Sequence, residues 1–116
     1  MPPIDAPSII SAGRIRAALA ISRERMARLL DVTAKTVARL EEHNRLPSNP
    51  TTATRLAQIQ EIVDLGLVVF TQDGFAQFMS TPFPAFRGLT ALQLIERGET
   101  ERVVGALASL HDGNPA

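Results

Sequence analysis

The 116-residue chain contains no cysteine, no tryptophan and no tyrosine, and its five aromatic residues are all phenylalanine. Without cysteine, a disulfide framework and a thiolate metal site are both excluded. Hydrophobic residues make up 45% of the chain but aromatic residues only 4%, so we expect a core built mainly from Leu, Ile, Val and Ala. A chain of this length can bury such a core without disulfides or structural metals.

Several functional motifs are also missing. No apolar run reaches the roughly 18 residues that a membrane-spanning helix needs, and no basic-then-apolar signal opens the chain. We therefore expect a cytoplasmic protein with no membrane partner. There is no Gly-rich phosphate loop, and the two histidines have no acidic residues clustered around them at metal-ligand spacing. We expect a protein that is not an enzyme and that carries no cofactor or metal.

The net charge of the chain is zero, which argues against binding to nucleic acid through bulk charge. The two halves nevertheless differ. Residues 1–50 contain eight Lys or Arg against five Asp or Glu, whereas residues 51–116 contain four against seven. This asymmetry is either ordinary surface scatter or the sign of a mildly basic half joined to an acidic half that meets a different partner.

Residues 22–47 have the pattern of two short helices joined by a tight turn. Ser22 is a suitable N-cap for the first helix, the sequence Asp31-Val32-Thr33 interrupts the apolar periodicity, and Thr33 can cap the second helix. Two helices that cross steeply need small and apolar residues where they meet, which is the packing of a helix-turn-helix. The positions predicted to face inward are Met26, Ala27, Leu29, Leu30, Val37 and Leu40.

The chain before this motif predicts an arm and one helix. Residues 1–7 carry three prolines and little to bury, so we expect a flexible N-terminal arm. Residues 8–20 predict a first helix with an apolar inner side. Arg14 and Arg16 are expected to be exposed on it.

A connecting helix is predicted after the motif. Asn49 is a good N-cap, and Pro50 suits the first helical position. The helix is expected to run towards Leu65. The apolar residues 65–70 are compatible with a buried strand or with more helix, and we favour helix because no second strand is present to pair with a strand.

The last third of the chain predicts short helices around an apolar loop. Phe75, Phe78 and Met79 share one helical face and are expected in the core. Residues 82–88 contain two prolines and a glycine, so they do not form a regular helix. Such an apolar loop must be buried against its own core or against a partner. A capping box over residues 90–93 opens the next helix, and a final helix with a Val/Leu stripe is expected from about residue 99.

The helix-turn-helix pattern resembles the Xre/Cro type. One departure is Asp31, at a turn position that usually holds Gly. Aspartate tolerates the left-handed conformation better than most residues, so we expect the turn to survive. The likeness rests on Met26-Ala27, Leu30-Asp31-Val32-Thr33, Thr36-Val37, Leu40-Glu41 and Leu46-Pro47.

If the second helix of this motif enters a DNA major groove, Thr33 and Thr36 suit phosphate contacts, and Lys35 and Arg39 can reach bases or phosphates. The alternative is that these side chains form the solvated face of an amphipathic helix. The Glu41-Glu42 pair at the end of the helix would repel phosphates. DNA binding is therefore one of two interpretations at this point.

Residues 75–110 resemble the C-terminal toxin-binding domain of the Xre/MbcA/ParS antitoxins. There are departures from the family pattern: Phe78 stands where Trp is usual, Phe83 where Asn is usual and Ala91 where Pro is usual. The order of an Xre-like unit followed by this domain is also the order in that family. The likeness rests on Phe78-Met79, Pro82, Phe86, Gly88, Leu92, Leu94-Ile95, Gly98, Val103-Val104 and Leu107.

The resemblance implies an antitoxin whose partner is a RES-domain toxin, an enzyme that destroys cellular NAD. It implies that the C-terminal region covers the active-site cleft of the toxin and keeps NAD out. It also implies a homodimer within a larger complex and, in many members, repression of the operon through the helix-turn-helix. By position, the toxin-binding residues would be Pro82, Phe83, Phe86, Arg87, Gly88, Glu99, Glu101, Arg102, His111 and Asp112.

Together these patterns predict an all-α protein, with an Xre-like helix-turn-helix bundle followed by a small helical toxin-binding domain. Two other functions stay open: a DNA-binding transcriptional regulator without a toxin partner, and a ParS-like adaptor that recruits another protein. The predicted units are the arm at 1–7, the helix-turn-helix at 8–47, the connecting helix at 48–71 and the toxin-binding domain with its C-terminal tail at 72–116.

Overall fold

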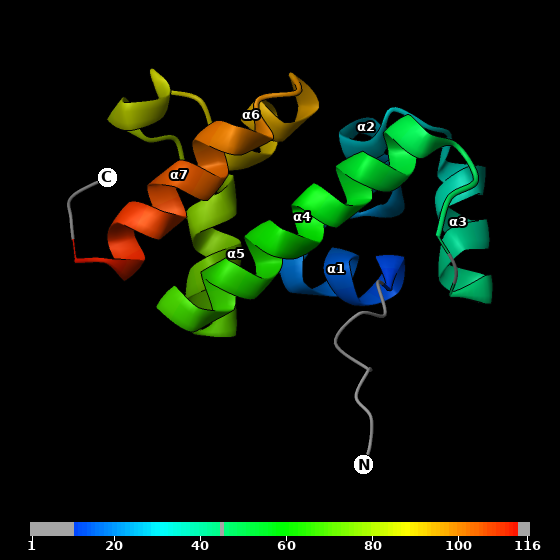
Figure 1. Cartoon of the computed structure of the whole chain (residues 1–116), viewed down its shortest axis with the longest axis horizontal. Helices are drawn as coiled ribbons and strands as arrows, with labels where there is room; N and C mark the ends of the chain where they lie inside the picture. The colour runs from blue at the N-terminus through cyan, green and yellow to red at the C-terminus, as the bar shows by residue number, and fades with distance from the viewer. Residues whose placement is uncertain (1–10, 45, 114–116) are drawn as a thin grey trace, which may run out of the picture.

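The computed structural model describes residues 11–44 and 46–113. Within these residues the chain is all-α, as predicted, with seven α-helices, one short 3-10 helix and no strand (Figure 1). None of the described helices is both long enough and apolar enough to cross a membrane. The elements are α1 (Ala12–Leu19), α2 (Arg23–Leu30), α3 (Ala34–His43), α4 (Pro50–Val69), α5 (Gln72–Ser80), η2 (Pro84–Phe86), α6 (Ala91–Glu96) and α7 (Thr100–His111).

Side-chain caps define where most of these helices begin. In each capped helix a Ser, Thr or Asn oxygen accepts a hydrogen bond from a backbone N–H two or three residues along, which satisfies a donor that the helix leaves unpaired. At Thr90 the predicted capping box is complete, because Gln93 also accepts from the backbone N–H of Thr90 at 2.8 Å. The capping residues are Ser11, Ser22, Thr33, Asn49, Thr71 and Thr90.

The turn between α2 and α3 has the left-handed geometry expected at Asp31. Its φ is 57°, and the following N–H of Val32 donates to the carbonyl of Ala27 at 3.0 Å. Together with the bond from the N–H of Asp31 to the carbonyl of Arg28, this bond satisfies carbonyls at the end of α2 in the manner of a Schellman cap. Ala20 ends α1 with a φ of 58°, although alanine carries no local signal for that conformation.

Some predicted boundaries differ from the structure. The first helix begins at Ala12, with Ser11 as its cap, rather than at residue 8. The predicted arm and residues 8–10 lie outside the described residues. His111 is the last residue of α7 rather than the start of a polar tail, and residues 114–116 are also outside the described part. The connecting helix continues through Val69, which confirms helix over strand in this stretch.

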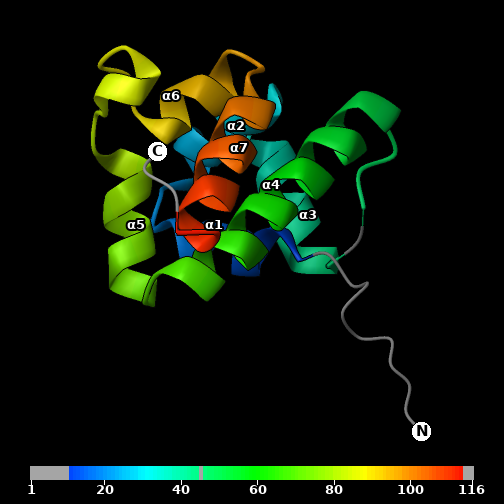
Figure 2. The same cartoon turned by 60° about the vertical axis from the view of Figure 1, so that its left-hand side comes forward.

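Helix α4 crosses the molecule and brings the two halves of the chain onto one core (Figures 1 and 2). It packs on α7 along much of its length and also contacts α1, α2 and α5. The predicted core positions Phe75, Phe78 and Met79 are buried, as are those of the helix-turn-helix. The largest fully buried side chains come from both halves: Ile15, Leu19, Met26, Leu29, Leu56, Ile59, Ile62, Phe75, Met79, Leu94, Ile95 and Leu107.

Polar contacts also join α2 to α6. The guanidinium of Arg55, on α4, donates to the carbonyls of Leu29 and Ile95 at 2.8 and 2.9 Å, near the ends of α2 and α6. Arg25 on α2 pairs with Glu96 on α6, with an Nε–Oε2 distance of 2.5 Å. The helix-turn-helix is therefore held against the C-terminal helices by charge-assisted contacts as well as by apolar packing.

Candidate functional site

An apolar groove of about 590 Å³ lies between α5, η2 and the last turns of α7. Its walls are mostly apolar, and such concave apolar surfaces are the usual places where ligands or partner side chains bind. The three elements meet on the left-hand side of Figure 1, where α7 passes in front of α5. The lining residues are Phe70, Gly74, Gln77, Phe78, Thr81, Phe83, Pro84, Ala85, Phe86, Ala106 and Leu110.

Four phenylalanines form a continuous cluster in this groove. The ring centroid of Phe78 lies 5.1 Å from that of Phe70, 5.0 Å from Phe83 and 6.4 Å from Phe86. Phe83 and Phe86 meet edge to face at 5.9 Å. Rings at these separations attract one another beyond the effect of burial, so the four side chains form one connected apolar cluster.

The loop that carries two of these rings has a fixed backbone. The N–H of Phe83 donates to the carbonyl of Leu89 at 3.2 Å, and the N–H of Gly88 returns to the carbonyl of Phe83 at 2.9 Å. Arg87 has a φ of 57° and Gly88 a φ of 82°, which turns the chain back on itself. Arg102 on α7 donates to the carbonyl of Ala85 at 3.2 Å. The loop is therefore tied to the last helix.

The predicted partner residues of the loop occupy different environments. Pro82, Arg87 and Gly88 are exposed, and Phe83 is half-buried. Phe86 is only 3% exposed and packs in the core, so its side chain supports the groove from below. The loop therefore directs the ring of Phe86 into the core and leaves Pro82, Arg87 and Gly88 exposed to solvent.

The predicted residues on the last helix fall at its two ends. Glu99 precedes the first turn and pairs with Arg102 at 3.1 Å, and Glu101 is exposed beside them. His111 and Asp112 lie at the other end, with 3.5 Å between Nδ1 and Oδ1. A 12-residue helix is about 18 Å long, so these two groups do not form one cluster. Between them α7 contributes Ala106 and Leu110 to the groove.

The predicted DNA-contacting residues lie on α3 and just before it, at the opposite end of the molecule from α5 and η2 (Figure 1). Thr33 caps α3, and its hydroxyl lies 3.0 Å from that of Thr36, which is half-buried. Lys35 and Arg39 are exposed, and neither forms an ion pair with the described residues.

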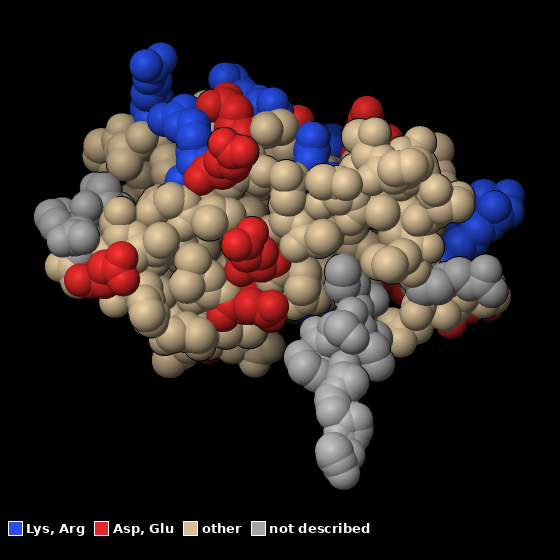
Figure 3. Space-filling model, in the orientation of Figure 1, with Lys and Arg blue, Asp and Glu red and all other residues tan. Residues whose placement is uncertain are grey.

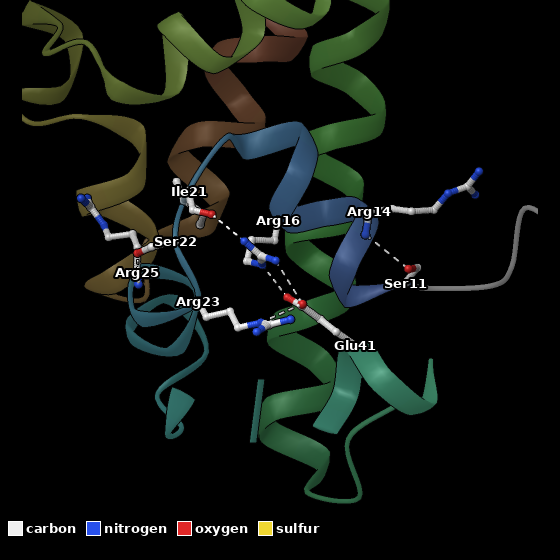
Figure 4. A network of polar contacts seen from close by, with 8 residues as sticks. All are labelled: Ser11, Arg14, Arg16, Ile21, Ser22, Arg23, Arg25 and Glu41. Carbon is white, nitrogen blue, oxygen red and sulfur yellow. Dashed lines mark hydrogen bonds and ion pairs between the residues drawn. The ribbon is translucent and has the colours of Figure 1, made fainter. Parts of the chain in front are cut away.

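Glu41, at the end of α3, does not extend into solvent as an unpaired acid. It accepts from Arg16 Nε at 2.5 Å and Nη2 at 3.1 Å, and from Arg23 Nε at 3.1 Å (Figure 4). These hydrogen bonds from Arg16 hold the pKa of Glu41 below its ordinary value, and the same contact raises the pKa of Arg16. The expectation that Arg16 is exposed is wrong, because its side chain is only 28% exposed.

The groove includes residues that sequence reasoning did not assign to the site: Phe70, Ala106 and Leu110. A signal for it was present, because all five phenylalanines of the chain lie between residues 70 and 86. Four of them line the groove. In the described part of the chain, no group of three or more His, Asp or Glu is placed to hold a metal ion.

Comparison with solved structures finds a match over nearly the whole chain. The fold is similar to that of one chain in the crystal structure of the M. tuberculosis MbcT–MbcA toxin–antitoxin complex, with a TM-score of 0.75 and 17% sequence identity. The match covers 95% of this chain and 97% of that one. No protein-family model matches the sequence, and a search of curated proteins found no match.

Proposed function

We propose that this chain is the antitoxin of a type II toxin–antitoxin pair. The observation that carries the proposal is the fold that it shares, over 95% of its length, with a chain of a toxin–antitoxin complex. The sequence resemblance of residues 75–110 to the toxin-binding domain of the Xre/MbcA/ParS antitoxins supports the same function. That resemblance also gives the partner, a RES-domain toxin that degrades NAD.

The aromatic groove and its loop are the surface that we assign to toxin binding. An apolar groove lined by four phenylalanines in mutual contact removes apolar area from water when a partner covers it. The loop is already fixed by prolines and by the bond from Arg102, so little conformational entropy is lost on docking. Pro82, Arg87 and Gly88 supply its exposed edge.

In this proposal the toxin is inhibited by occlusion of its active site. Glu99 and Glu101 lie at the N-terminal end of helix α7 and Asp112 follows its C-terminal end, so the last helix carries acidic groups at both of its ends. A cleft that receives the phosphates of NAD carries positive potential, and acidic side chains complement it. The chain itself catalyses nothing, acts in the cytoplasm and works as a homodimer within a larger complex with the toxin.

A second activity, DNA binding by α3, is favoured by a separate observation. Lys35 and Arg39 are exposed without ion pairs among the described residues, and Arg16 and Arg23 already neutralise the neighbouring Glu41. This reduces the repulsion of phosphates expected from the end of α3. Repression of its own operon is compatible with toxin binding, because α3 lies at the opposite end of the molecule from α5 and η2, which line the groove (Figure 1).

The proposal is tested with a RES-domain protein encoded next to this chain. That protein is expressed alone and together with this chain, and cellular NAD and growth are followed. We expect NAD loss and growth arrest with the toxin alone, both prevented by this chain, and co-purification of the two proteins. NAD loss that this chain leaves untouched contradicts the proposal and favours a DNA-binding regulator or a ParS-like adaptor.

A further inference from the structure

The outward face of α4 is apolar in part and no described element covers it. Val68 is 67% exposed, the largest exposed fraction among the three exposed large hydrophobic side chains of the described residues. Ala57, Glu61 and Asp64 precede it at intervals of three and four residues, so all four lie on one side of the helix. They line a shallow hollow of about 450 Å³ together with Gln60 and Leu65.

Helix α7 extends this face. A smaller hollow of about 220 Å³ lies between the two helices and is lined by Gln58, Glu61, Thr100, Glu101 and Val104. The carboxylates of α4 and α7 thus face one hollow from its two sides. Neither Glu61 nor Glu101 forms an ion pair with any described residue.

The charged side chains on this face are all acidic. The two arginines of these helices are directed elsewhere: Arg55 donates to carbonyls at the ends of α2 and α6, and Arg102 donates to Ala85 and Glu99. Arg14, on α1, lies outside the face and lines a neighbouring hollow, which Asp64 also lines. Figure 3 views this face and shows acidic groups across α4 and α7, with basic groups mainly along the upper edge and at the α3 end.

The acidic charges indicate which kind of partner this face can bind. A second copy docking in two-fold fashion would place the same carboxylates opposite each other, and like charges brought together in an interface are costly. A basic surface on a different protein would instead place opposite charges against these carboxylates. The aliphatic stem of a Lys or Arg can pack on Val68 or Val104 while its charged end meets Glu61.

We propose that the α4–α7 face, defined by Ala57, Glu61, Asp64, Val68, Glu101 and Val104, docks a basic patch of a heterologous protein. This rests on the proposed function, in which that protein is the toxin. Ala106 and Leu110 line the aromatic groove, whereas Glu101 and Val104 belong to the α4–α7 face. Helix α7 therefore separates two contact surfaces, and a single large partner contacts both.

Binding of the purified RES-domain protein to this chain tests the proposal. The double variant Glu61→Lys/Asp64→Lys reverses two exposed charges on α4. We expect it to weaken binding at least about 30-fold at low salt and less at high salt, because salt screens the interaction. The neutral variant Glu61→Gln/Asp64→Asn should fall between it and the wild type. The matched control Glu24→Lys, on exposed α2 surface, should stay within about twofold of the wild type.

The outcomes separate this inference from the proposed function. Unchanged binding by the charge-reversed variant, with an unaltered circular dichroism spectrum and melting temperature, overturns the inference and leaves toxin binding standing. Absence of binding by the wild-type chain overturns both. Light scattering supplies a further check: a wild-type dimer that Val68→Arg converts to a monomer would assign the face to a second copy and overturn the inference.

Discussion

The ring of Phe75 lies directly against the backbone of Gly66. A Cβ added to Gly66 would be 2.2 Å from Cε1 of Phe75, whose side chain is fully buried and has no room to move. Alanine favours a helix by about 1 kcal/mol over glycine. At this position overpacking should outweigh that gain, and we predict that Gly66→Ala destabilises the protein by about 1–3 kcal/mol in urea unfolding.

Gly105, on α7, is the matched control for this substitution. It lies in a helix interior, and a Cβ there would meet nothing within 4 Å. Gly105→Ala should therefore stabilise the protein by about 0.5–1 kcal/mol through helix propensity. A Gly66→Ala variant as stable as Gly105→Ala would contradict the close approach of α4 and α5.

The contact between Arg16 and Glu41 predicts an acid-sensitive contribution to stability. The pKa of Glu41 is lowered in the folded protein, so its stabilising effect is present above the unfolded-state pKa, roughly 4.3, and is lost as the pH falls through the folded value. We predict that Glu41→Gln costs about 1–2 kcal/mol near pH 7. This cost should shrink below about pH 4. Urea unfolding at a series of pH values measures it, and a difference independent of pH would contradict the ion pair.

Substitution in the aromatic groove should weaken toxin binding without unfolding the protein. Ala106 is half-buried and lines the groove, so the Ala106→Glu variant places a charge on the apolar surface that we propose the toxin covers. We predict a loss of affinity of at least about 100-fold, measured by calorimetry. The control Ala17→Glu, at an exposed position on α1, should bind normally. Normal binding by Ala106→Glu would exclude the groove from the interface.

If α3 binds DNA, the affinity should depend on the salt concentration and on the two cationic side chains of Lys35 and Arg39. The double variant Lys35→Ala/Arg39→Ala removes the exposed cations of α3, and it should lower affinity for DNA from the region upstream of the gene about 10-fold or more. It should also reduce the slope of log affinity against log salt by one to two units. Fluorescence anisotropy over a salt series measures both quantities. Equal binding by variant and wild type would show that α3 does not contact DNA.

The parts of the fold that follow local rules could be predicted from the sequence. Ser22, Thr33, Asn49 and Thr90 cap their helices as expected, because a cap depends on residues within one turn. Asp31 adopts the left-handed turn for a reason contained in its own side chain.

Contacts between distant residues could not be predicted in this way. Arg55 reaches the carbonyls of Leu29 and Ile95, which are 26 and 40 residues away in the sequence. Glu41 is paired with Arg16, 25 residues earlier, although its position at a helix end suggested an unpaired acid. No short-range pattern encodes these distances, because they depend on how α1, α2, α3 and α4 pack.

The sequence indicates which part of the chain forms the aromatic groove but not the shape of the groove. The apolar loop indicated burial against either its own core or a partner, and the sequence did not distinguish these alternatives. In the structure the loop is partly buried and partly exposed: Phe86 lies in the core, and Pro82 faces solvent. The groove itself requires Phe70, at the end of α4, and Leu110, on α7, which lie 40 residues apart in the sequence and are brought together by the packing of these helices.

In the function that we propose, this chain blocks the active site of an NAD-degrading toxin. The most direct measurement is the rate at which the purified RES-domain protein consumes NAD while this chain is titrated into it. We expect NAD consumption to fall to zero when the binding sites are saturated, and Ala106→Glu to require a much higher concentration for the same effect. A stable complex that consumes NAD at the rate of the free toxin would contradict occlusion.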